Sequence, residues 1–521
     1  MRSIISRITQ GKALTFDGVS DCIFNKENIA KTSEVFKSLW NGSLNSCKTL
    51  SQHFECRLIP LNKAHPKVPN TNQIRPIVVS SPVLKLMEAG FISEVEKYLH
   101  SNILRSQTGF IKGLSTQVNL WRLLSKCQNL IQDNNRCYVL FIDLKNVYNS
   151  IPHQPLFDII EKKIGGTFSQ FTKAMYTRLR IKLGEEIIYP SRGVPQGSLL
   201  SPFLFDLYLD DCLRAISEKY NVNEDNILAY ADDIAIICSS LDKLKEIASS
   251  IESLFMKFGL ILNKEKSGCL EVRKPRSHIL LRDENISGFP VVEMYKYLGV
   301  EISQTLSCVP YVKRLRQTIN ALRVNLFPFL AHASAQDSLF LWQLMVRPLF
   351  DYGGLFFRND RVKSHQDYLY RTIRNSIRTF IGLNKSTKKD AVEPLIKHDF
   401  EKWNNHLWTS SEKAWRDWKN YETPTEIRWK EDVFKQVEIP REWISYTNLL
   451  TKPCPRCIKG KTPMSANHLK YFHNIIVPSA RDLLEKFILI SKEKVKRNKE
   501  ETKNVISQLG KIYLEYLSTI I

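Results

Sequence analysis

Three aspartates are the residues best placed to do chemistry. Asp143 stands in the segment CYVLFIDL, and Asp232 and Asp233 form a doublet within ILAYADDIAII. Both segments are otherwise apolar, and a carboxylate in such surroundings is costly unless a cation meets it. Two neighbouring strands that carry such acids can hold two divalent cations, one to activate an attacking hydroxyl and one to neutralise a leaving pyrophosphate. Magnesium suits this role because it prefers oxygen ligands and shares its coordination shell with phosphates.

A simpler explanation exists for a single aspartate, which most often caps a turn or pairs with a basic side chain. A doublet at the tip of an apolar hairpin, partnered by a second carboxylate strand, is harder to explain in that way. The sequence therefore predicts a site for two Mg²⁺ ions at Asp143, Asp232 and Asp233.

A second group of candidate metal ligands lies near the carboxyl terminus. Cys454, Cys457, His468 and His473 read C-x2-C-x10-H-x4-H. Two thiolates and two imidazoles at this spacing supply four tetrahedral ligands, which predicts a closed, structural zinc site. The alternative is two reduced cysteines and two surface histidines. The remaining nine cysteines show no framework spacing, and this pattern indicates a reducing compartment.

The elements that must position these residues follow from periodicity. Strands are expected at CYVLFIDL, NILAYADDIAIIC and YKYLGVEIS, which are short, rich in β-branched or aromatic residues and bounded by polar or glycine-containing segments. From about residue 311 the apolar spacing becomes helical, with Leu315, Ile319, Leu322 and Leu326 on one face. Arg371, Arg374 and Arg378 form a basic stripe further along. We expect four parts: 1–135, 136–305 with the carboxylates, a helical basic region at 306–440, and 441–521 with the cysteines and a helical tail.

Composition identifies a class of partner. The 521 residues include 75 Lys and Arg against 53 Asp and Glu, a formal net charge of +22. Such an excess favours a polyanion, and 43% hydrophobic residues exclude a disordered basic tail. No apolar run reaches the 18 residues of a membrane span, so no membrane partner is expected.

Several segments follow one another along the chain in a recognisable order: GKALTFDGV, RLIPLNK with IRPIVVSSPVLKLMEAG, QTGFIKGLST, FIDLKNVYNSIPH, GVPQGSLLSPFLFDLYLDD, AYADDIAII, GLILNKEKSG and YKYLGVEIS. This order resembles that of the motifs of a reverse transcriptase, most closely those of non-LTR retrotransposons. The resemblance implies an α+β right-hand polymerase, with fingers in 1–135, an antiparallel palm sheet in 136–305 and a helical thumb in 306–440. A small zinc knuckle and a helical tail would follow.

The resemblance also implies residue roles. Asp143 and Asp232 would hold both metal ions, and Asp233 would complete the site or order its surroundings. Tyr148 would lie under the incoming sugar and exclude a 2′-hydroxyl, although a core aromatic is the simpler interpretation of Tyr148 taken alone. Asn149 departs from the family, in which an acid usually stands at that position, and this affects the support of the following helix but not the reaction class.

Five further residues would contact the substrate. Arg75 and Lys63 would reach the triphosphate, since guanidinium and ammonium groups both pair with phosphate oxygens. Gln196 would touch the sugar and the template base, and Gly197 would allow close approach of the backbone. Lys266 would approach the leaving pyrophosphate as a general acid. Lys63 and Lys266 are equally compatible with solvated surface positions, and the segment 295–302 resembles a primer grip.

A cysteine and histidine knuckle after the polymerase resembles site-specific non-LTR elements, in which an endonuclease domain follows. Only 521 − 473 = 48 residues follow His473, so we expect any nicking activity to be truncated or to come from elsewhere. The expected function is RNA-directed DNA synthesis, with an RNA template, a DNA primer or target DNA, and dNTPs as partners. The alternatives are an intron-encoded maturase and a non-catalytic RNA-binding protein of the same fold. An intracellular, nuclear location is expected, or a mitochondrial one for an intron-encoded protein.

Overall fold

The computed structural model describes residues 54–64, 66–70, 73–111, 114–360 and 362–384, together with a few isolated positions at 33–41 and 387–392. All structural statements below concern these residues. They fall into two compact units, with the boundary between Leu298 and Gly299. Within the described ranges, no helix combines the length and the apolar character needed to cross a bilayer.

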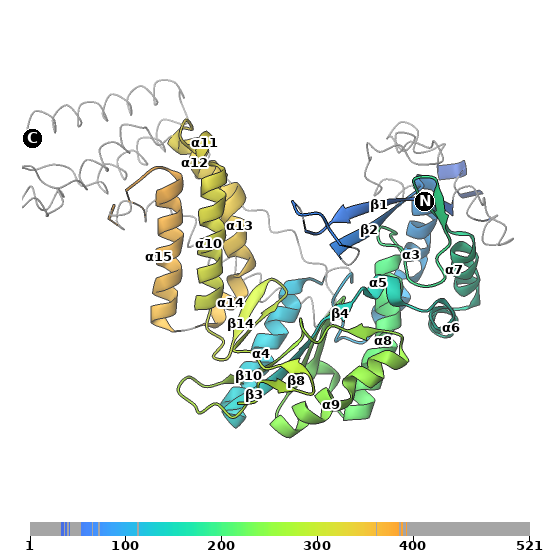
Figure 1. Cartoon of the computed structure of the whole chain (residues 1–521), viewed down its shortest axis with the longest axis horizontal. Helices are drawn as coiled ribbons and strands as arrows, with labels where there is room; N and C mark the ends of the chain where they lie inside the picture. The colour runs from blue at the N-terminus through green and yellow to red at the C-terminus, as the bar shows by residue number, and fades with distance from the viewer. Residues whose placement is uncertain are drawn as a thin grey trace, which may run out of the picture. The chain divides into compact units, whose positions relative to one another are not determined.

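The core of the first unit is a four-stranded antiparallel sheet in the order β10-β3-β8-β7. Its strands are β3 (Arg136–Ile142), β7 (Ile227–Tyr230), β8 (Asp233–Cys238) and β10 (Gly268–Arg273). Nearly every residue of β3 and β8 is buried, as expected for continuous apolar runs, and helices α4 (Thr116–Asn134) and α9 (Leu241–Lys257) pack against the sheet (Figure 1). The strands expected at CYVLFIDL and NILAYADDIAIIC are confirmed.

A second four-stranded sheet has the order β2-β1-β5-β6. It contains β1 (Glu55–Asn62), β2 (Ile74–Ser80), β5 (Arg180–Leu183) and β6 (Glu186–Ile188). Strands β1 and β2 form an antiparallel hairpin, whereas β1 and β5 run parallel. Helix α3 (Pro82–Asn102) begins directly after β2, so that β2 and α3 form a continuous strand–helix unit.

The remaining elements complete the first unit. They are β4 (Leu144–Lys145), α5 (Val147–Ser150), α6 (His153–Lys163), α7 (Gly166–Arg178), α8 (Ser201–Tyr220), a 3₁₀ turn at Glu224–Asn226, β9 (Ile261–Leu262), β11 (Asn285–Ile286), β12 (Phe289–Pro290) and β13 (Met294–Tyr297). The mixed α/β character expected from the sequence is confirmed for this unit. The seven cysteines that the structure describes are all free and buried.

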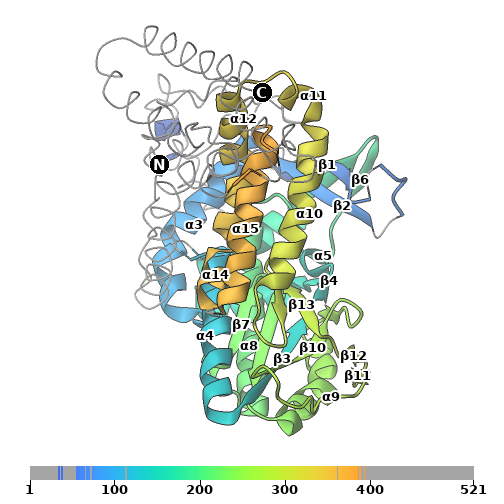
Figure 2. The ribbon, with the colours of Figure 1, turned by 90° about the vertical axis from the view of Figure 1, so that its left-hand side faces the viewer.

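The described part of the second unit is mostly helical. After β14 (Val300–Ser303) come α10 (Val309–Asn325), α11 (Phe327–Leu330), α12 (Ala335–Leu341), a π-helical turn at Trp342–Val346, α13 (Arg347–Tyr352), α14 (Gly354–Asn359) and α15 (Lys363–Phe380). Helices α10 and α15 lie side by side (Figures 1 and 2). Leu315 and Ile319 are buried, whereas Leu322 and Leu326 are only partly buried, so the predicted apolar face is confirmed for its first half.

The expected arginine stripe on α15 is only partly exposed. Arg371 lies at the surface, whereas Arg378 is 6% exposed and donates to the Asn375 side chain at 2.8 Å. The three arginines therefore do not form one exposed surface, because Arg378 is buried. The helix turns this position inward because Ile377 and Phe380, which flank it, are core residues.

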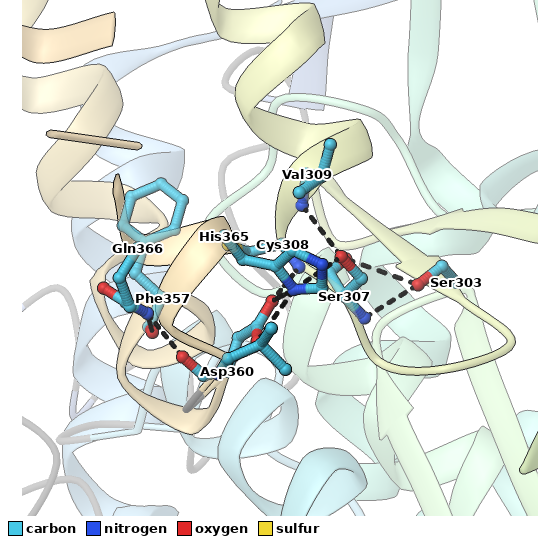
Figure 3. Close-up of polar contacts among 9 residues, drawn as sticks. Ser303, Ser307, Cys308, Val309, Phe357, Asp360, His365 and Gln366 are labelled. Carbon is cyan, nitrogen blue, oxygen red and sulfur yellow. Dashed lines mark hydrogen bonds and ion pairs between the residues drawn. The ribbon is translucent and has the colours of Figure 1, made fainter. Parts of the chain in front are cut away.

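A buried carboxylate joins the start of α10 to the start of α15 (Figure 3). Asp360 Oδ2 accepts the Cys308 N–H at 2.7 Å and lies 2.8 Å from Nδ1 of His365. Ser307 Oγ lies 3.2 Å from the same ring nitrogen and accepts the Val309 N–H at 3.3 Å. Because Ser307 and Asp360 contact one nitrogen, the imidazole cannot relay a proton between them as a hydrolase triad does. The cluster instead caps two helices with a negative charge near both N-termini.

Replacing Asp360 with alanine is expected to destabilise the second unit by about 2–4 kcal/mol, because it leaves the buried Cys308 N–H and the partly buried His365 ring without their partner. The measurement is chemical denaturation of the full chain followed by circular dichroism. Asp367→Ala is the matched control, since Asp367 lies exposed on the same helix. Equal midpoints for the two variants would contradict the capping role.

Candidate active site

The three predicted aspartates meet at one end of the central sheet. Asp143 directly follows β3, Asp232 lies in the tight turn between β7 and β8, and Asp233 opens β8 opposite Tyr230. Ile142 pairs with Ile234 across β3 and β8, which places the two carboxylate-bearing strand ends next to each other. The turn needs a left-handed residue, and Ala231 takes that conformation with φ +53°. The aspartates thus stand at strand ends, half-buried, rather than within the strands.

Burial and neighbouring carboxylates raise the pKa of Asp232 and of Asp233. Burial is the main cause of the raised pKa of Asp232, and the charge of Asp143 adds to it. Burial, followed by the charges of Asp232 and Asp143, raises the pKa of Asp233 to about 6. Three acids that repel one another in a partly desolvated place are unfavourable as a purely structural feature. They are the kind of group that marks a functional site.

Asp143 is held in place by the segment that follows β9. Asn263 Nδ2 donates to Asp143 Oδ2 at 2.9 Å, and the Asp143 N–H donates to Ser267 Oγ at 3.0 Å. The Asn263 N–H also donates to the Asp143 carbonyl at 2.8 Å, next to the β4–β9 pairing. These contacts fix one carboxylate oxygen and leave the other available to a cation.

The donor set fits magnesium in an open site. All three side chains offer carboxylate oxygens, their mutual repulsion favours a cation between them, and a magnesium ion keeps places for water and substrate phosphates. Within the described ranges, no group of three or more His, Cys, Asp or Glu side chains, the three aspartates included, is arranged to hold a metal ion by itself. The predicted zinc ligands Cys454, Cys457, His468 and His473 lie outside the described residues.

Tyr148 lies beside this cluster on α5. Its ring stacks on Phe205 of α8 with centroids 5.4 Å apart, and its carbonyl accepts the Val194 N–H at 2.5 Å. Burial raises the pKa of the phenol, and the charges of Asp206 and Asp232 raise it further. The phenol is therefore neutral at physiological pH and lies close to the carboxylates, held from one side by Phe205.

Gln196 and Gly197 lie in a loop that is pressed against β2. The Val78 N–H donates to the Gln196 carbonyl at 2.6 Å. Gly197 has φ +121°, and a Cβ at this position would stand 2.3 Å from the Val78 carbonyl oxygen. The close backbone approach that the sequence assigns to Gly197 is thus made to the protein's own strand β2.

The basic candidates take different positions. Arg75 lies exposed on β2, and its charge lowers the pKa of Asp232, so it stands near the carboxylates. Lys63 is exposed at the tip of the β1–β2 hairpin, where its N–H donates to the Gln73 carbonyl. Lys266 is exposed, and its carbonyl accepts the Tyr295 hydroxyl at 2.8 Å. Tyr295 in turn stacks on Phe141 of β3 at 4.2 Å.

Sequence reasoning missed three residues that support the site. Asn263 holds Asp143, while Glu88 and Ser198 hold the Gln196 loop. A signal exists for two of them: Glu88 is the only acid in the apolar run PVLKLMEAGFI, and Asn263 ends the apolar run LILN. A charged or amide side chain within such a run must find a buried partner.

One end of the antiparallel sheet thus gathers three carboxylates, with a stacked tyrosine beside them. Residues 62–302 match the family model described as reverse transcriptase (RNA-dependent DNA polymerase). Residues 62–302 therefore match a reverse transcriptase domain, and the relatives of the chain include proteins of retrotransposable elements.

Two relatives are Pol polyproteins of the type-1 retrotransposable element R2. The protein from Nasonia vitripennis is 24% identical over 310 residues, which is 54% of this chain and 29% of that protein. The protein from Popillia japonica is 24% identical over 307 residues, or 52% and 43% of the two chains. The probable RNA-directed DNA polymerase from transposon BS of Drosophila melanogaster is 26% identical over 258 residues, or 46% and 28%. The chain thus spans less than half the length of these relatives.

Among solved structures, the chain is similar to telomerase from Candida tropicalis in complex with a fragment of telomeric RNA. The two are 13% identical with a TM-score of 0.37, and the similarity covers 76% of this chain and 68% of the telomerase chain.

Proposed function

We propose that this chain is an RNA-directed DNA polymerase that adds dNTPs to a primer 3′-hydroxyl. The observation that supports the proposal best is the cluster of Asp143, Asp232 and Asp233 at the end of the sheet, where burial and neighbouring carboxylates raise the pKa of Asp232 and Asp233. A scaffold protein would gain nothing from these acids, because desolvation and repulsion make them costly. The match to the reverse transcriptase family supports the same reaction.

In this proposal each residue has one task. The three aspartates would hold two Mg²⁺ ions, which supply charge neutralisation at the attacking and leaving oxygens. Arg75 and Lys63 would pair with the triphosphate, and Tyr148 would exclude a 2′-hydroxyl. Lys266 Nζ would give a proton to the leaving pyrophosphate.

Further contacts are proposed for the sugar and for the nucleic acid. Gln196 would contact the sugar and the template base of the nascent pair, with Gly197 allowing the loop to approach closely. An RNA template and a DNA primer or target would bind through phosphate contacts, in agreement with the formal net charge of +22.

The test is incorporation of dTTP on poly(rA) primed with oligo(dT), in Mg²⁺ and in Mn²⁺, with Asp232→Ala purified in parallel. Template-dependent incorporation by the wild type alone supports the proposal. If wild type and variant are equally inactive in both metals while still binding RNA, the protein is a non-catalytic RNA-binding protein instead.

The cysteine and histidine cluster is proposed to hold a structural zinc ion. Four ligands at the spacing of a zinc knuckle, in a basic segment, support this proposal. Purified protein is expected to contain about one zinc per chain by mass spectrometry of the metal, and Cys454→Ser to lose it. Cys308→Ser, at a buried free cysteine of the second unit, should keep the zinc. Purified wild-type protein that contains no zinc would contradict the proposal.

A further inference from the structure

Helix α3 places a buried acid beneath the Gln196 loop. Glu88 is 1% exposed. One of its oxygens, Oε1, accepts the Ser198 hydroxyl at 2.6 Å, and the other, Oε2, accepts the Leu199 N–H at 3.0 Å. Both oxygens act as acceptors at once, so the arrangement is that of an ionised carboxylate. A proton on either oxygen would oppose one of the two donors.

The same loop is held from its other side by β2. The Val78 N–H donates to the Gln196 carbonyl at 2.6 Å, and Gly197 leaves no room for a side chain against the Val78 carbonyl. Strand β2 also carries Arg75, and α3 follows β2 directly. The strand–helix unit formed by β2 and α3 therefore carries Arg75 and also holds the loop that contains Gln196.

Ser198 connects the Glu88 carboxylate to the start of helix α8. While its hydroxyl donates to Glu88, its oxygen accepts the N–H groups of Leu200 and Ser201 at 3.1 and 3.2 Å, at the start of α8. Helix α8 carries Phe205, on which the Tyr148 ring stacks. A change at Glu88 would therefore affect both the Gln196 loop and Phe205, which supports the Tyr148 ring.

The charge of Glu88 is costly in this place. Two other titratable groups face it: Lys85 on its own helix, whose charge lowers its pKa, and Tyr176 on α7, whose own pKa is raised by burial and by Glu88. Burial has the largest effect and raises the pKa of Glu88 to about 7. An apolar residue would fill the space at lower cost, so the acid serves something other than packing.

We propose that Glu88 is a positioning residue for the incoming nucleotide, whose carboxylate holds the Gln196 loop against β2 and so sets the affinity of the site for dNTP. The inference rests on the proposed polymerase function. It assigns no chemistry to Glu88 itself, which acts through Gln196 and the loop.

The decisive variant is Glu88→Gln, because the amide keeps the shape but can accept from only one of the two donors. We expect KM for dTTP to rise roughly tenfold at pH 8, with a smaller change in kcat. In the wild type KM should rise as pH falls through about 7, where Glu88 takes up a proton. The variant should show a flat KM over this range. Acids at the metal site affect wild type and variant alike, so the difference between the two profiles isolates Glu88.

The thermal stability of Glu88→Gln should not fall together with its affinity for nucleotide. The folded-state pKa of Glu88 is raised above its ordinary value of 4.5, so its protonated form stabilises the fold below that value and this contribution is lost as pH rises through about 7. A merely structural glutamate would lose activity and stability together. Glu88→Gln is therefore expected to melt at pH 8 no lower than the wild type while binding nucleotide less tightly.

Glu271→Gln is the matched control. Glu271 is also 1% exposed and accepts two backbone N–H groups, those of Leu280 and Leu281, but it lies on β10 and has no contact with the loop. Its KM and pH profile should equal those of the wild type. Ser198→Ala, which removes one of the two bonds to Glu88, should raise KM in the same direction as Glu88→Gln.

Hydrogen exchange of the peptide covering residues 195–201 gives a readout that does not need activity. Exchange should be faster in Glu88→Gln than in wild type at pH 8, after correction for intrinsic rates. If wild type incorporates nucleotide and Glu88→Gln matches it in KM, pH profile and exchange, the inference is wrong and the polymerase function stands. If wild type is inactive but the exchange difference is present, the loop contact stands and the function is wrong.

Discussion

Replacing Asp232 with alanine is expected to lower templated nucleotide incorporation by at least about 1,000-fold in Mg²⁺. Asp232 lies in the β7–β8 turn, where the charge of Asp143 raises its pKa and its own charge raises the pKa of Asp233. Removing it takes away a carboxylate shared by the proposed metal ions. The measurement is steady-state incorporation on poly(rA)·oligo(dT) with wild-type and variant chains at equal concentration.

The stability of the same variant separates a catalytic role from a structural one. Asp232 has a raised folded-state pKa, so its stabilising contribution is present below the ordinary aspartate value and lost as pH rises through the folded value. At pH 8 without metal, the charge is therefore a cost to the fold. Asp232→Ala should melt no lower than wild type under these conditions, and added Mg²⁺ should stabilise wild type more than the variant.

Asp242→Ala is the matched control for this prediction. Asp242 lies exposed in the first turn of α9, shortly after β8, so its loss should leave incorporation unchanged. Full activity in Asp232→Ala would contradict the metal role. A variant that is inactive and also unfolded would point to a structural role instead.

The central sheet and its carboxylates were predictable because their signals are local. Asp143, Asp232 and Asp233 interrupt short apolar segments that have few other ways to fold, and β3, β7 and β8 appear where those segments lie. The turn at Asp232 follows from the short interval between two strands. The family resemblance added roles that the pattern alone could not supply, such as that of Tyr148.

Residues that act through distant partners were not predictable. Glu88 and Ser198 are 110 positions apart, and Asn263 and Asp143 are 120 apart. No periodicity relates them, since their contacts depend on how α3 and β9 are placed by the rest of the fold. The burial of Arg378 was not predictable for a related reason. Its spacing matches that of Arg371 and Arg374, but the packing of Ile377 and Phe380 turns it inward.

Tyr148→Ala is expected to admit ribonucleotides, reducing the preference for dTTP over UTP by roughly 100-fold. The ring stands close to Asp232 and is stacked on Phe205, so it has little freedom to move aside for a 2′-hydroxyl. Alanine would open that space while leaving the three aspartates in place. The measurement is the ratio of kcat/KM for dTTP and UTP on the same primed poly(rA).

Tyr148→Phe separates bulk from hydrogen bonding. Phenylalanine keeps the ring and its stacking on Phe205 but removes the hydroxyl, whose raised pKa keeps it protonated at neutral pH. If exclusion is steric, Tyr148→Phe should discriminate as the wild type does, and only alanine should accept UTP. If both variants keep the wild-type ratio, Tyr148 is a core aromatic and the gate lies elsewhere. If both variants lose the preference for dTTP over UTP equally, the hydroxyl of Tyr148 and not its ring discriminates between the two sugars.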